Sequence, residues 1–280
     1  MKIQLMSDLH LEAHPRWRAT PAPGADLLVL AGDIGSYQAG SLLADQDFGL
    51  TQFSPHHGWP TPVLFVPGNH EYDALEFDLA HARLRDTCER LGIGWLEREV
   101  VCFHDARGKA VRFVGTTLWS DFDALGPSAQ ASDSGSSTLL AQQLKARDKA
   151  FRAANYYLKK AGTTHHGVPM LAEQVREQSL ICQEWLSQVL LQAFDGITVV
   201  VTHFAPSLMS VDPRYGLTPG SAGFCNALDA LLPRAQFWLH GHLHAPSTYV
   251  LAGCRVIANP LGYARKNEQN AFQAGLCIEV

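Results

Sequence analysis

The sequence predicts an α/β fold in which two β-sheets pack together and helices cover their outer faces. Residues 27–31 form a continuously apolar run, which is expected of a strand covered on both faces. Strands alternate with helix-forming segments early in the chain, whereas short β-rich runs dominate its end, and this distribution is typical of two packed sheets. Folds of this class with 280 residues commonly form one large core. We therefore expect a single domain over residues 1–280.

In the first half of the chain, short apolar runs predict strands that end at polar residues. The alternating residues 2–6 predict the first strand, and a Pro-rich loop over residues 13–24 separates it from the second. The further elements expected here are a helix near residues 40–53, a strand over 63–66, an amphipathic helix over 73–91 and two β-rich runs over 100–104 and 110–116, separated by a hairpin-like turn.

The composition changes after residue 120. Residues 121–138 are rich in Ser, Ala, Gly and Pro and predict a mobile loop, which helices over 139–160 and 169–193 follow. Together, residues 121–195 predict a loop and a helical insertion that caps the site. The remaining elements expected are a helix over 222–232 and strands over 197–201, 236–239, 248–251, 255–258 and 275–280.

The helix predicted over residues 139–160 carries six basic residues. They are Lys145, Arg147, Lys149, Arg152, Lys159 and Lys160. We interpret them as a solvated helix face, because such faces are common on protein surfaces. A clamp for a substrate phosphate is the alternative.

Charge and cysteine content narrow the functional class. The chain has 22 basic and 27 acidic residues and a net charge of -5, which argues against general binding of nucleic acid or anionic membranes but leaves room for a local basic patch. Six cysteines without a CxxC pair indicate reduced, mostly buried thiols. Since the N-terminus reaches a carboxylate at Asp8 before a signal-peptide core forms, we expect a soluble, cytoplasmic protein.

Polar residues that can bind metal follow five of the predicted strands. They are Asp8 and His10, Asp33, Asn69 with His70, His203, and His242 with His244. In open α/β sheets the carboxyl ends of the strands form the edge where ligands bind. We therefore expect these side chains to form a site at one sheet edge.

The donor atoms of this set are oxygen and imidazole nitrogen, which suit Mn, Fe, Zn or Mg ions. Apart from His70, the set holds seven candidate ligands, which are too many for one tetrahedral zinc and fit two ions that share a carboxylate. Two ions about 3.5–4 Å apart can clamp the attacking and leaving oxygens of an in-line displacement and generate hydroxide near neutral pH. Phosphoester hydrolysis is the reaction for which this arrangement is best suited.

The five segments in order resemble the calcineurin-like metallophosphoesterase superfamily. Its pattern runs DxH, GD, GNH followed by D or E, a later H, and GHxH, and the chain matches each element between residues 3 and 244. The resemblance implies a four-layer αββα sandwich with the site at the sheet edge. It also implies a hydrolase whose single metallophosphoesterase domain spans residues 1–280.

The same resemblance implies a role for each residue. Asp8, His10 and His244 hold one metal ion, Asn69, His203 and His242 hold the other, and Asp33 bridges the two. His70 binds no metal but contacts the phosphate and protonates the leaving alkoxide, a task suited to a group that titrates near neutrality. Among divalent ions we expect Mn first, with Fe, Zn, Ni or Mg as alternatives.

Three functions stay open. The first is hydrolysis of a small phosphodiester, phosphomonoester or nucleotide, which the acidic chain and central insertion favour. The second is a protein Ser/Thr phosphatase or a nuclease, and the third is a non-catalytic scaffold, which we disfavour because Asn69 and His70 are both present. The oligomeric state is open as well.

Several other residues near these motifs have less specific interpretations. We expect Glu71 and Asp73 to cap the next helix and to orient His70. His240 is interpreted as a strand residue, and His165 and His166 as ordinary polar surface. Where many bacterial relatives have a second histidine, Phe204 makes the pocket more apolar.

Overall fold

The computed structural model describes residues 1–126 and 136–280, and most of its strands lie in two large mixed sheets. The first sheet has the order β13 (Cys277–Glu279), β1 (Lys2–Met6), β2 (Leu27–Ala31), β3 (Val63–Val66) and β4 (Gly94–Trp95). The second has the order β11 (Ser247–Leu251), β12 (Cys254–Ala258), β10 (Phe237–His240), β9 (Ile197–Thr202), β6 (Ala110–Thr116) and β5 (Glu99–His104). This architecture confirms the predicted α/β class with two mixed sheets.

The two sheets pack face to face through alternating apolar side chains. Ile3 and Leu5 of β1 point into the same buried cluster as Val199 and Val201 of β9. Because successive side chains of a strand point to opposite faces, Met6 joins the separate cluster on the outer side of the first sheet. Every residue of β2 is buried, as its continuous apolar run predicts.

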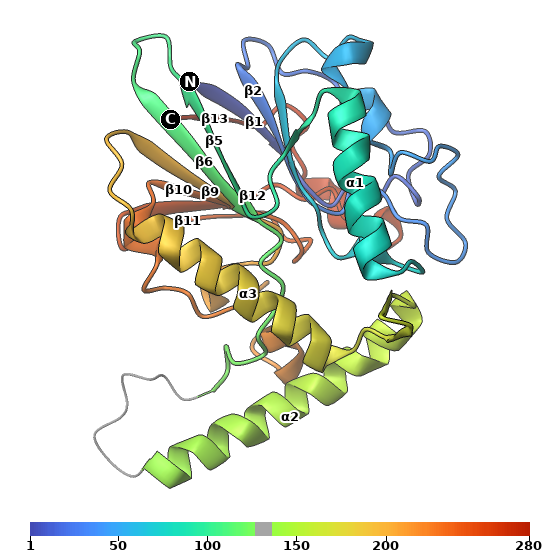
Figure 1. The fold of residues 1–280 in the computed structure, drawn as a ribbon, viewed down its shortest axis with the longest axis vertical. Helices are drawn as coiled ribbons and strands as arrows, with labels where there is room; N and C mark the ends of the chain where they lie inside the picture. Colours follow the sequence, from blue (N-terminus) through green and yellow to red (C-terminus); the bar gives the residue numbers. More distant parts are fainter. Residues whose placement is uncertain (127–135) are drawn as a thin grey trace.

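Helices cover the outer faces of this sandwich (Figure 1). Helix α1 (Phe77–Leu91) packs beside β4 of the first sheet, and α3 (Ala172–Leu191) packs on β6 of the second. The layers are therefore helix, sheet, sheet, helix. Helix α2 (Ser136–Ala161) lies farther from the sheets and contacts α3 and the 3-10 helix Pro219–Gly223.

The predicted helical cap over residues 121–195 is not confirmed. Cys182, Leu186 and Leu190 of α3 are buried in the outer core, so this helix is a layer of the sandwich. Of the predicted mobile loop, residues 127–135 lie outside the described residues. Phe122, at its start, is buried.

Two of the predicted helices are wrong. Near residues 40–53 only the 3-10 helix Leu50–Phe53 forms, because the Asp45 side chain accepts the backbone N–H groups of Asp47 and Gly49 and competes with helix formation. Over residues 222–232 the backbone pairs with the loop after β9 instead, since the Asn226 N–H donates to the Ala205 carbonyl at 2.9 Å.

The helix predicted to begin at residue 73 begins at Phe77 because the Glu76 side chain accepts the Leu79 N–H and caps it. Between α2 and α3 the chain also forms a short hairpin of β7 (Thr164–His165) and β8 (Val168–Pro169), which the sequence did not predict. Among the helices of the described residues, none is long and apolar enough to span a bilayer.

Candidate metal centre

The strand pairing explains why distant motifs meet. Strands β1, β2 and β3 run parallel, as do β9 and β10, so their carboxyl ends lie along one edge of each sheet. The backbone N–H of His242 donates to Asp8 Oδ1 at 2.8 Å and joins the two edges. All seven predicted ligands lie at this junction.

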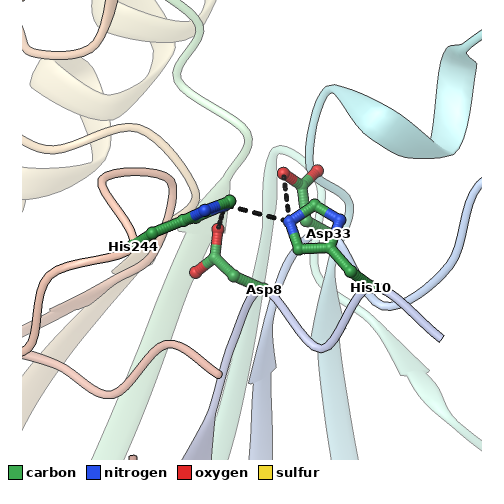
Figure 2. A group of neighbouring side chains, drawn as sticks. All are labelled: Asp8, His10, Asp33 and His244. Carbon is green, nitrogen blue, oxygen red and sulfur yellow. Dashed lines mark hydrogen bonds and ion pairs between the residues drawn. The ribbon is translucent and has the colours of Figure 1, made fainter. Parts of the chain in front are cut away.

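Four of them form a first group, which Figure 2 shows from three segments of the chain. His10 Nε2 lies 2.9 Å from His244 Nε2, and His244 Nε2 lies 3.5 Å from Asp8 Oδ1. Asp33 Oδ2 completes the group at 4.0 Å from His10 Nε2. These donor atoms converge on one point, as the ligands of a single ion do.

The second group shares Asp33 with the first. Asp33 Oδ2 lies 3.2 Å from His203 Nε2, and His203 Nε2 lies 3.2 Å from both His242 Nδ1 and Asn69 Oδ1. The Asp33 carboxylate therefore stands between the two groups, where a bridging ligand belongs.

The donor set has the character of a metal site. Asp8 Oδ2 and Asp33 Oδ2 are buried and have no hydrogen-bond partner among the described residues. A buried carboxylate oxygen without a partner is costly, and a divalent cation removes that cost. The carboxylate and imidazole donors suit the divalent ions that the sequence analysis predicted, namely Mn, Fe, Zn or Mg. The residues present therefore fit two metal ions.

Further carboxylates hold the imidazoles from behind. His10 Nδ1 is 3.0 Å from Glu12 Oε1, and His244 Nδ1 is 2.7 Å from Glu268 Oε2. Such partners orient the ring and direct its other nitrogen to the metal. The sequence analysis missed both partners. Glu12 could have been considered from the sequence, because it follows His10 by two residues. Nothing in the sequence indicates that Glu268 lies beside His244.

The pKa values of these two carboxyl groups are shifted in opposite directions. Burial raises the pKa of Glu12 to about 7. Burial also acts to raise the pKa of Glu268, but the hydrogen bonds from His244 and from the Tyr263 N–H outweigh it and lower that pKa to about 2.

The backbone at the site is strained. Five of the seven predicted ligands are in the left-handed region with φ between 46° and 73°, namely Asp8, His10, Asp33, His242 and His244. Residues other than glycine adopt this region at a cost and do so mainly at functional sites. Gly68 is needed for close approach, since a Cβ there would lie 2.2 Å from Asp33 Oδ1.

His70 lies beside the centre but outside both ligand groups. Its Nε2 is 4.0 Å from Asp33 Oδ2, and its Nδ1 is 2.5 Å from Asp73 Oδ2. Burial acts to lower the pKa of His70, but Asp33 and Asp73 outweigh burial and raise it well above its ordinary value. The His70 side chain is 26 % exposed, so its ring is accessible to solvent beside the centre.

The expected helix caps are wrong, since Glu76 rather than Glu71 or Asp73 caps α1. Asp73 does contact His70 Nδ1, which is consistent with the expected role in orienting the ring. Glu71 instead binds the turns of the centre and accepts the backbone N–H groups of Gly68 at 2.7 Å and Ile34 at 2.6 Å.

Aromatic rings line both sides of the centre. Tyr263 stacks on His10 with ring centroids 4.2 Å apart, and Phe204 stacks on His242 at 4.0 Å. Phe224 lies 5.3 Å from His242 and is partly exposed. Tyr263 and Phe224 were missed in the sequence. His240 is a strand residue, as predicted. It is buried, and its Nε2 lies 2.9 Å from Ser210 Oγ.

Comparison with known proteins decides the family. The sequence model described as calcineurin-like phosphoesterase matches residues 1–246. The chain belongs to the calcineurin-like phosphoesterase family. It is therefore a metallophosphoesterase, an enzyme of the class that hydrolyses phosphoesters with a pair of metal ions.

One sequence relative and two solved structures of similar fold align with this chain over most of their length. Uncharacterized protein L509 of Acanthamoeba polyphaga mimivirus is 24% identical over 304 residues, with 99% of this chain and 96% of the relative covered. The structure resembles the phosphopantetheinyl hydrolase of Mycobacterium tuberculosis with TM-score 0.69 and 18% identity, over 100% of this chain and 95% of that one. A dimetal phosphatase of Danio rerio has TM-score 0.50 and 15% identity, over 94% and 88% of the two chains.

Proposed function

We propose that this metallophosphoesterase hydrolyses a small phosphoester at a binuclear centre bridged by Asp33. The observation that carries the proposal is the Asp33 carboxylate, which both ligand groups share. Its Oδ2 lies 4.0 Å from His10 Nε2 and 3.2 Å from His203 Nε2. Asp8, His10 and His244 would hold one ion, and Asn69, His203 and His242 the other. We expect Mn first, with Fe, Zn, Ni or Mg as alternatives. When bound, such a pair supplies hydroxide near neutral pH and offsets charge on the phosphoryl oxygens.

His70 is proposed as the general acid. Its Nδ1 is held by Asp73, so Nε2 is the nitrogen free to donate a proton to the leaving oxygen. The neighbouring Asp33 and Asp73 carboxylates favour the charged ring, which has a proton to give. Asp73 acts through His70 and is a positioning residue.

The surroundings of the centre support a small substrate. Phe224 is partly exposed 5.3 Å from His242 and offers an apolar surface beside the centre, which suits an aromatic or extended group on the phosphorus. Phe204 and Tyr263 are buried against His242 and His10 and make the walls of the centre apolar. The net charge of -5 gives little attraction to a nucleic-acid backbone. A protein Ser/Thr phosphatase or a nuclease on the same site is the alternative, and a scaffold without activity is the least favoured. A cytoplasmic location remains part of the proposal.

The substrate panel that tests this proposal compares ester types at fixed metal. Protein loaded with Mn is assayed on an aryl phosphomonoester, the matching aryl diester, a nucleotide, a phosphopeptide and single-stranded DNA. A phosphopantetheinyl diester is added because the M. tuberculosis hydrolase shares the fold along the whole chain. The proposal expects kcat/KM to be highest for a small ester. A higher value for the phosphopeptide or the DNA would contradict it.

A further inference from the structure

A second cluster of metal-binding side chains lies away from the centre. Asp78 is in the first turn of α1, and His165 and His166 are at the tip of the β7–β8 hairpin. Asp78 Oδ2 is 3.6 Å from His165 Nε2 and 3.2 Å from His166 Nε2. Both imidazoles therefore point their Nε2 atoms at the same carboxylate oxygen.

The surrounding backbone fixes this arrangement. The Thr164 N–H donates to the Leu75 carbonyl at 2.9 Å, and the His166 N–H donates to Glu76 Oε1 at 3.1 Å. The same Glu76 caps α1, so one residue joins the helix to the hairpin. His166 has φ 52°, and this turn conformation directs two adjacent side chains to one side.

We propose that Asp78, His165 and His166 form a third metal site for a divalent transition ion such as Zn²⁺, Ni²⁺ or Cu²⁺. Two imidazole nitrogens and one carboxylate oxygen are ligands these ions prefer, and water completes the coordination. The rings of the two histidines lie 4.0 Å apart. Two positively charged rings repel each other at this separation, whereas two neutral rings can both bind one cation.

The ion would join two parts of the fold that already meet beside the catalytic loop. The Ala74 N–H donates to the Ala161 carbonyl at 2.8 Å, and Thr163 Oγ1 donates to the Tyr72 carbonyl at 3.0 Å. Residues 72–78 thus connect His70 to α1 on one side and to the end of α2 on the other. A metal at the hairpin tip would hold this junction together without touching the catalytic centre.

Metal counting on the intact chain tests the proposal. Untagged, chelator-treated protein is dialysed against buffered Zn²⁺, and bound zinc per chain is measured for the wild type, His166→Ala, Asp78→Asn and His57→Ala. His166 has 75 % of its side chain exposed, so its truncation leaves the core intact. His57 is an exposed histidine outside both clusters and serves as the matched control.

The proposal predicts about one fewer zinc ion per chain in His166→Ala and in Asp78→Asn, and an unchanged count in His57→Ala. Turnover of an aryl phosphoester with Mn is expected to stay at the wild-type level in all three variants. Equal zinc counts in the wild type and the two cluster variants would overturn the proposal. An equal loss in His57→Ala would also overturn it, because zinc would then bind surface histidines without selection.

Discussion

In the proposed mechanism, Asp33 binds metal and His70 donates a proton. Asp33 belongs to both ligand groups, whereas His70 belongs to neither. The His70 backbone N–H donates to Asp33 Oδ1 at 2.8 Å, and its ring lies beside the Asp33 and Asp73 carboxylates. Substitutions of the two residues should therefore fail in different ways. A substitution that removes bound metal identifies a metal ligand. A substitution that lowers turnover but keeps the metal is the result expected for a general acid.

Replacing His70 by alanine is expected to leave the metal content unchanged and to lower kcat on an alkyl phosphoester by about 10²–10⁴-fold. A nitrophenyl ester should lose much less, because its leaving group needs no proton. Rates for both esters and the metal content are measured side by side, with His57→Ala as the control. An alkyl ester rate at the wild-type level would exclude His70 as the acid.

The carboxylate behind His244 should control metal affinity. Glu268→Gln keeps the shape of the side chain but removes the charge that holds His244 Nδ1–H. We expect the affinity for Mn to fall by about 10–100-fold, as for other partners of metal-bound histidine. Calorimetric titration of metal-free protein measures it. Glu89→Gln, at an exposed position on α1, should bind normally. Equal affinities in both variants would show that Glu268 has no such role.

At the scale of elements, α3 forms a layer of the sandwich, whereas α2 lies farther from the sheets. Leu186 of α3 is fully buried, whereas Leu144 of α2 is 49% exposed. Leu186→Ala should lower the free energy of unfolding by about 2–5 kcal/mol because it leaves a cavity. Leu144→Ala should change it by less than about 0.5 kcal/mol. Urea unfolding curves compare the two. A small effect at Leu186 would argue against α3 as part of the sandwich.

Sequence patterns correctly predicted the secondary-structure elements that depend mainly on the residues within them. Residues 27–31 and 63–66 were assigned correctly because a strand buried on both faces is apolar throughout. The candidate ligands could be recognised because each follows a predicted strand. The helix near residues 40–53 was wrong because the Asp45 side chain captures backbone N–H groups. Glu268 was beyond reach because only the folded chain brings it to His244.

At the scale of the whole molecule, the thiols report on the packing of the outer core, which contains Cys88, Cys182 and Cys254. Cys88, Cys182, Cys225 and Cys254 are buried, and burial raises the pKa of Cys225 and of Cys254 to about 12. Cys102 is exposed and Cys277 is half-buried. Alkylation of the native protein at pH 8 should label Cys102 first and spare the four buried thiols, since the thiolate is the reacting form. Mass spectrometry of peptides checks the order, and rapid labelling of all six would contradict the fold.

The binuclear centre is tested most directly by measuring metal content and turnover together in the wild type and in Asp33→Asn. Chelator-treated protein receives Mn, Fe, Zn, Ni or Mg separately, and bound metal and hydrolysis of an aryl phosphoester are measured for each ion. We expect turnover in the wild type to return as the centre binds about two ions, and Asp33→Asn to lose metal and turnover together. If Asp33→Asn kept both, Asp33 would not be the bridge and the proposed centre would be wrong.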